Sequence, residues 1–201
     1  NAQGGTFTMT GGAITNNTCS GSKGYCVGGV DIVSPISITL GGSAVITGNT
    51  ANGVENNVYV ENNGTKITVG TGANAPTDDM NVGVTMADGK GVFTDATATS
   101  ADYAQYFHSD NTAYYVVHNN DGKLALVSKW GALNNVLGKT NLSADDTIEN
   151  FFTVAADGKT ITLTGDFAAE SGDTTLTVTG TKVLDLAGHV VDAKNIIGTV
   201  G

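Results

Sequence analysis

The side chains that could do acid–base or nucleophilic chemistry are few and scattered. A catalytic carboxylate pair must converge on one bond, but the paired acids here, Asp78-Asp79 and Asp145-Asp146, occur where a turn or a helix start accounts for them. All 9 basic residues are Lys, so the Arg used by many polysaccharide lyases is missing, and the three histidines lie in separate segments without zinc-ligand spacing. The sequence therefore predicts no enzyme, no catalytic residue and no cofactor-binding residue.

Calcium is the one inorganic ligand that the composition leaves open. Asp and Asn oxygens at stacked turns are suitable Ca²⁺ ligands, and two clusters offer them: Asp78, Asp79 and Asn81, and Asp145 with Asp146. Neither cluster has the spacing of a known calcium loop. We therefore expect a chain without cofactors and keep bound calcium as the alternative.

Cys19 and Cys26 enclose a short Gly- and Ser-rich stretch that is flexible enough to let them meet. A disulfide here would contribute about 2.5 kcal/mol by loop entropy. Two free thiols are the alternative, whereas a redox or metal pair is disfavoured because the spacing is not C-x-x-C and no His lies nearby.

Four tyrosines that lie close together in the sequence are candidate glycan contacts: Tyr103, Tyr106, Tyr114 and Tyr115. Aromatic rings stack on sugar rings, but they also anchor loops by packing on a core. Packing is the interpretation that we favour, and sugar binding is the alternative.

The formal net charge of -10 excludes partners that are themselves polyanions. Nucleic acid and anionic membranes both require clustered cations, and the lysines are scattered singly. The longest apolar stretches are only a few residues, far below the roughly 20 that cross a bilayer as a helix, which predicts no membrane insertion. The excess of carboxylates over lysines suits an extracellular protein that is secreted or attached to a cell wall.

Gly, Thr and Asn dominate the composition, with 28, 29 and 19 residues, and they favour strands and turns over helices. Short alternating segments such as 6–10, 36–40 and 66–69 are separated by Gly-Gly or Asn-Gly turns. One block nearly repeats, since residues 11–18 match 42–50. A β-sandwich needs longer strands, so we favour an all-β parallel β-helix, whose coils require short strands and small corner residues.

The pattern of short alternating segments ends at residue 95, and the sequence predicts three parts. Residues 1–94 form β-helix coils, and residues 95–128 form a lid of a short helix at 100–107 followed by a β-hairpin around 119–122. Residues 129–201 begin with a helical cap and end in further coils. Within the cap, Trp130, Leu133, Val136 and Leu137 share one helical face, and a second helix is expected over 143–152.

Several segments resemble the repeats of bacterial cell-surface proteins that form a right-handed parallel β-helix, of the pectin-lyase-like, adhesin-like kind. The similarity lies in Thr6–Thr15, in 56–60 with 66–69, in 130–133, and in the Leu-Asp-Leu-Ala-Gly-His motif of 184–189. It implies a right-handed solenoid displayed at the cell surface, and no activity.

In the family that the chain resembles, the Trp cap comes first, the coils next and the hairpin segment last. Here residues 129–201 would precede 1–128, so we expect one period of a repeat array whose copies join head to tail. The predicted function is that of a structural, adhesive repeat in a β-helical stalk or filament. A carbohydrate-binding module or a degenerate polysaccharide-processing β-helix, with host or microbial glycans as partners, is the alternative.

Overall fold

The computed structural model describes residues 5–21, 26–33, 36–61, 66–95, 101–119, 121–148, 151–168 and 175–199. The chain divides into two compact units, Asn1–Leu126 and Val127–Gly201, next to the division after residue 128 that the sequence predicts. Within the described residues, no helix has the length and apolar character needed to cross a bilayer.

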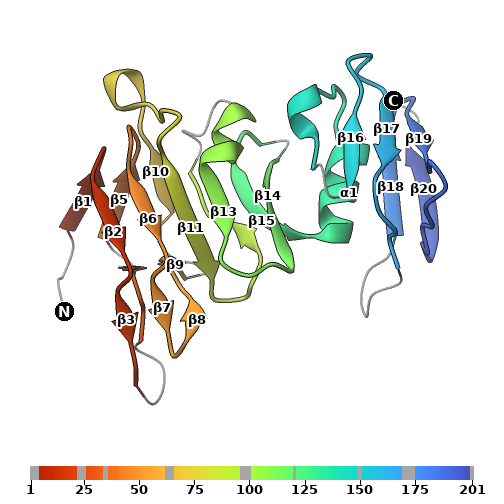
Figure 1. The fold of residues 1–201 in the computed structure, drawn as a ribbon. Helices are drawn as coiled ribbons and strands as arrows, with labels where there is room; N and C mark the ends of the chain where they lie inside the picture. The colour runs from red at the N-terminus through yellow and green to blue at the C-terminus, as the bar shows by residue number, and fades with distance from the viewer. Residues whose placement is uncertain are drawn as a thin grey trace. The chain divides into compact units, whose positions relative to one another are not determined.

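The first unit is a β-solenoid of about three turns with parallel, stacked coils, which confirms the predicted fold class (Figure 1). One face consists of β1 (Gly5–Met9), β5 (Ile36–Leu40) and β10 (Ile67–Val69). A second face consists of β2 (Ala13–Thr15), β6 (Val45–Thr47), β11 (Asn81–Met86) and β13 (Phe107–Ser109). The third contains β4 (Val30–Ile32), β9 (Val58–Val60) and the second half of β11.

The turns between faces carry the smaller elements. The first two coils each extend outward between the second and third faces, and there β3 (Thr18–Cys19), β7 (Thr50–Ala51) and β8 (Val54–Glu55) form a small sheet that we call the ledge. The third coil has no ledge, because β11 passes directly from one face to the next. A 3-10 turn, η1 (Gly72–Asn74), lies between β10 and β11.

Strand register explains why the coils stack. In parallel pairs, side chains opposite each other point to the same side, so apolar residues form columns inside the coil while Thr and Ser point outward. The columns of the two longest faces are Phe7, Ile38 and Ile67, and Ile14, Ile46, Val82 and Phe107. From the second coil onward these residues are almost wholly buried. The core is therefore a thin apolar column.

After the coils, the first unit contains a short sheet whose Leu124 and Leu126 belong to the buried core. A sheet of β12 (Gly91–Val92), β15 (Leu124–Ser128) and β14 (Tyr114–His118) provides the hairpin. The short helix is a 3-10 helix, η2 (Ala101–Tyr106). The sequence pattern did not indicate β13, which adds a fourth strand to the second face of the solenoid.

The second unit begins with α1 (Lys129–Gly138), whose N-cap Ser128 accepts a bond from the Gly131 N–H. Its buried face contains Trp130, Leu133, Val136 and Leu137, as predicted, and α1 packs on β18 (Thr175–Thr179). Two further parallel pairs follow: β17 (Thr160–Leu163) with β19 (Val183–Asp185), and β18 with β20 (Asn195–Thr199).

The predicted helix over 143–152 is wrong. Among the described residues of this stretch, 143–148 and 151–152, the helical part is the 3-10 turn η3 (Ala144–Asp146), and β16 (Phe152–Val154) then runs antiparallel to β17. Ser143 and Asp146 make a capping box, but backbone hydrogen bonds between Ile148 and Phe152 end the helical path. The buried aromatic Phe152 is better packed on the sheet, so tertiary packing overrides the capping signal.

Candidate functional site

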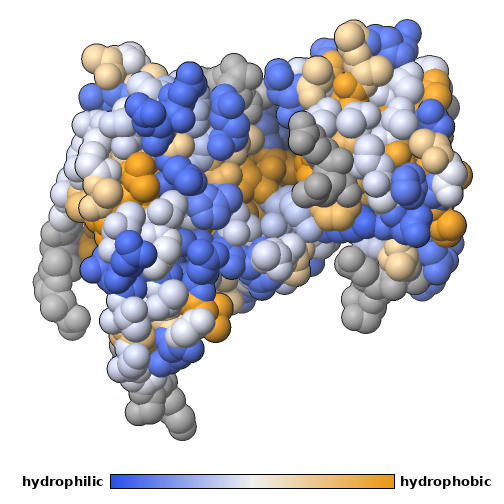
Figure 2. All heavy atoms as spheres, viewed as in Figure 1, coloured by the Kyte–Doolittle hydropathy of each residue, from blue (hydrophilic) through white to orange (hydrophobic). Residues whose placement is uncertain are grey.

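The last coil of the second unit has an open edge. β19 and β20 each pair on one side only among the described strands. Ile196 lies opposite the buried Leu176, so it points toward the coil interior, yet it is 68% exposed. Val190 is 61% exposed. Figure 2 shows apolar patches at the right margin of the view, where Figure 1 places β19 and β20. We call this surface the trailing edge.

The first coil of the first unit has the complementary kind of edge. β1, β2 and β4 are all edge strands within the described part of the chain. Phe7 lies in the column above the buried Ile38, but it is 36% exposed because no described strand covers it. Ile14 is half-buried for the same reason. We call this surface the leading edge; both edges present unpaired backbone groups that favour strand addition.

A chain of polar side chains, exposed at Asn17 and buried from Asn49 to Asp110, runs across the first unit behind the ledge. Asn17 donates from Nδ2 to Asn49 Oδ1 at 2.8 Å, Asn49 donates to Asn57 Oδ1 at 2.9 Å, and Asn57 donates to Asp110 Oδ1 at 2.6 Å. Thr85 Oγ1 also donates to Asp110, at 2.6 Å. Asn49 and Asn57 are fully buried, so these bonds satisfy groups that would be costly to leave unpaired. We call this feature the asparagine ladder.

Asp110 and two backbone groups set the direction of the ladder. The Asn49 N–H donates to Asn57 Oδ1 at 2.9 Å, and the Asn17 N–H donates to Asn49 Oδ1 at 3.0 Å. An ionised carboxylate only accepts hydrogen bonds, and Asp110 accepts from both the backbone N–H and the side-chain amide of Asn57. The Asn57 oxygen must then face Asn49, and the Asn49 oxygen must face Asn17. At the leading edge, Asn17 therefore has its side-chain oxygen as the remaining acceptor, and within the described residues no donor approaches it.

Gly83 makes room for the ladder in the third coil. A Cβ at this position would collide with the Asp110 carboxylate and the Asn57 amide. The sequence analysis missed the ladder, although a signal exists. Asn17, Asn49 and Asp110 each stand three positions after an inward-facing residue of the second face, namely Ile14, Ile46 and Phe107.

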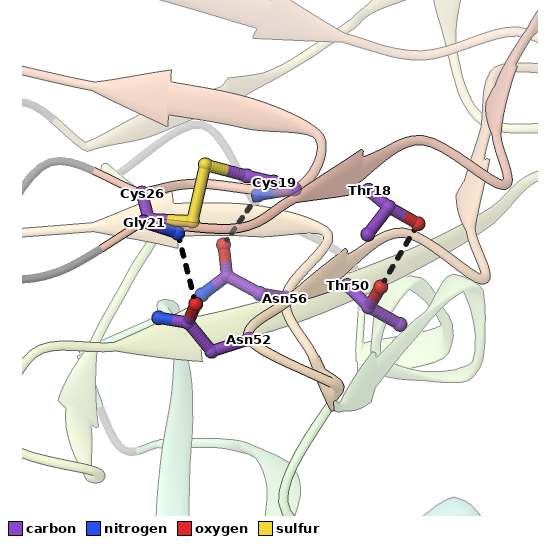
Figure 3. Close-up of a disulfide and its surroundings, with 8 residues drawn as sticks. Thr18, Cys19, Gly21, Cys26, Thr50, Asn52 and Asn56 are labelled. Atoms are coloured by element: carbon purple, nitrogen blue, oxygen red, sulfur yellow. Dashed lines mark hydrogen bonds between the residues drawn. A yellow bond between two sulfur atoms is a disulfide. The ribbon is translucent and has the colours of Figure 1, made fainter.

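Cys19 and Cys26 form a disulfide in the structure (Figure 3). The bridge closes the ledge segment of the first coil, and hydrogen bonds tie this segment to the second coil. Asn52 Oδ1 accepts from the Gly21 N–H at 3.1 Å, and Asn56 Oδ1 accepts from the Gly28 N–H at 3.1 Å. The disulfide is thus a structural staple of the ledge, close to the leading edge.

The candidate glycan tyrosines are half-buried and do not form an open aromatic row. Tyr103, Tyr106 and Tyr114 pack against the core of the first unit, and the Tyr103 and Tyr106 ring centroids are 6.3 Å apart. The Tyr106 hydroxyl lies 3.4 Å from Asp78 Oδ1, and the Tyr115 hydroxyl donates to the Thr112 carbonyl at 3.1 Å. This arrangement favours packing, while contact with sugars stays a prediction.

The acids considered for calcium are engaged in local structure. Asp145 and Asp146 bond to Ser143, and Asp146 also forms an ion pair with Lys139. Asp78 is within reach of Tyr106. In the described part of the chain, no three His, Cys, Asp or Glu residues lie close enough to hold a metal ion. Calcium binding stays a prediction.

Asp166 reinforces the last coil at the trailing edge. Its Oδ1 accepts from the Val190 N–H at 3.0 Å and lies 3.2 Å from His189 Nδ1. These donors stabilise the carboxylate, so the pKa of Asp166 is below its ordinary value; the bond from the Val190 N–H is the larger cause and His189 adds to it. At the leading edge, burial raises the pKa of Asp31, and the charge of Glu61 raises it further.

A shallow polar hollow lies in the second unit, between the loop of residues 140–142 and Asp157 to Lys159. Its two lysines are Lys159 and Lys182, and the Lys182 ammonium donates to the carbonyl oxygens of Lys139 and Thr179. The hollow contains no aromatic residue and no pair of facing carboxylates.

No protein-family model matches the chain, and neither a curated protein nor a solved structure is significantly similar to it.

Proposed function

We propose that the chain is a structural repeat of a β-helical stalk or filament whose copies join head to tail. The observation that carries the proposal is the pair of open coil edges, in which inward-facing apolar residues such as Ile196 and Phe7 are exposed. Buried counterparts of both residues lie in the adjacent coils of their own units. A further coil on each edge would remove these residues from water.

The direction in which the coils advance along the chain favours a head-to-tail arrangement. In both units the coils advance in chain order, so the trailing edge accepts a following coil and the leading edge accepts a preceding one. A contact between two different surfaces of the same chain generates an open filament unless the rotation between copies closes it into a ring. Such a solenoid would be stiff, and its length would grow with the number of copies.

The location proposed for the filament is extracellular, either secreted or attached to a bacterial cell wall, with an adhesive role. The Cys19–Cys26 disulfide supports an oxidising compartment. The scarcity of cations supports a surface that stays soluble without binding polyanions. The repeat-like coil segments support the adhesin-like identity that the sequence resemblance implies.

Negative-stain electron microscopy of the purified chain at increasing concentration tests this function. We expect rods of constant width whose length increases with concentration. Isolated particles at every concentration, each with the mass of one chain, would contradict the proposal.

A further inference from the structure

We propose that the trailing edge of one copy docks on the leading edge of the next in a single register, with Leu184 above Phe7 and Val191 above Ile14. This inference rests on the proposed function and specifies the joint between copies. The occupant of each edge is thus a second copy of this chain, and the joint is a continuation of both solenoid cores.

The spacing of inward-facing residues defines this register. Leu184 lies opposite the buried Ile161, and Val191 lies opposite the buried Phe167, so both point into the coil. Leu184 and Val191 are seven positions apart, and so are Phe7 and Ile14. Two faces can therefore align at the same time, which a shift by one residue would prevent because every side chain would change sides.

Both coils use a left-handed glycine at the corner between the two aligned faces, one position apart in the proposed register. Gly188 has a φ of 87° and would lie opposite Gly11, whereas Gly12 carries the φ of 80° in the leading coil. Ala187, beside Gly188, is also left-handed, with a φ of 48°. Both coils therefore turn between these two faces through the conformation that glycine adopts without strain.

The absence of a ledge in the trailing coil does not prevent docking. Within the first unit, the second coil carries a ledge and the third coil does not, yet β6 and β9 both pair with β11. The asparagine ladder bridges the step, because Asn57 of the second coil reaches Asp110 beyond the third coil. The same combination of a coil with a ledge and a coil without one would occur at the joint.

Cysteine cross-linking between separately purified variants tests the register. In the proposed joint, the outward-facing Val183 lies opposite Thr6, at a strand spacing of about 4.8 Å that a disulfide can span. We therefore expect Val183→Cys mixed with Thr6→Cys to give a cross-linked dimer under mild oxidation. Val183→Cys mixed with Thr8→Cys is the matched control, because it displaces the pair by two residues and should give little product.

The outcomes separate the register from the proposed function. If unmodified chains associate but the Thr8→Cys mixture cross-links best, or both mixtures cross-link equally, the register is wrong and head-to-tail joining stands. If the unmodified chain does not associate at all, both are overturned.

Discussion

Replacing the Asp110 carboxylate should remove hydrogen bonds from the asparagine ladder and destabilise the first unit. Asp110 is 8% exposed and accepts three hydrogen bonds, two from Asn57 and one from Thr85. Asp110→Asn keeps the size of the side chain but turns one acceptor oxygen into a donor. At the Oδ1 position that donor would face the Asn57 side-chain amide, and at the Oδ2 position it would face the Asn57 backbone N–H, so at least one bond is lost.

The expected magnitude follows from the number of donors left without a partner. Losing one bond to a charged acceptor and leaving one buried donor unsatisfied costs about 2 kcal/mol for Asp110→Asn. Asp110→Ala leaves all three donors unpaired, and since such losses are not additive we expect about 3–5 kcal/mol. Asp79→Asn replaces an exposed carboxylate of the same unit and should change the free energy of unfolding by less than about 0.5 kcal/mol.

Urea denaturation combined with hydrogen exchange and mass spectrometry is the appropriate assay, because peptide-level exchange reports on each unit separately. We expect Asp110→Asn to increase exchange at Asn49 and Asn57 while peptides of residues 127–201 exchange as in the wild type. If Asp110→Asn is as stable as Asp79→Asn and exchange at Asn57 does not change, the ladder does not stabilise the solenoid and the reasoning is refuted.

Three further predictions concern the staple, the trailing edge and the tyrosines. Replacing both Cys19 and Cys26 by Ser should lower the free energy of unfolding by about 2.5 kcal/mol, as measured by urea denaturation; no change would show that the ledge is ordered without the bridge. Because the pKa of Asp166 is lowered in the folded state, its carboxylate stabilises the protein at neutral pH, and this stabilisation is lost as the pH falls through the folded-state pKa. Asp166→Asn should therefore lose less free energy of unfolding on acidification than the wild type. Parallel plots of unfolding free energy against pH would contradict this. If the tyrosines only pack, Tyr106→Ala and Tyr115→Ala should not alter a glycan-array profile; binding that these changes abolish would favour the carbohydrate-binding alternative.

The parallel coils could be predicted because each strand carries its own signal. In Thr6–Thr10 and 36–40, apolar residues alternate with Thr or Ser, and small corner residues end each segment. The face of α1 that packs on β18 was predictable for the same reason, since helical spacing alone places its apolar residues together. Local patterns of this kind survive in the structure because the core uses them directly.

Features that depend on which coil lies next to which could not be predicted in the same way. β13 became a strand because Phe107 completes a column begun by Ile14, and the partner strand lies 25 positions earlier in the sequence. The ladder required knowing that Gly83 leaves space for two polar side chains. In the second unit, the helix expected at 143–152 does not form, because Phe152 is buried against the sheet instead.

The central claim is that copies join through the open coil edges, and sedimentation velocity of two variants tests it most directly. Ile196 and Ile197 are neighbours on β20 with similar exposure, but Ile196 points into the coil and Ile197, opposite the exposed Thr177, points outward. We predict that the wild type and Ile197→Lys form larger species as concentration rises, whereas Ile196→Lys sediments as a monomer. A wild type that stays monomeric at every concentration, or two variants that behave alike, would contradict the claim.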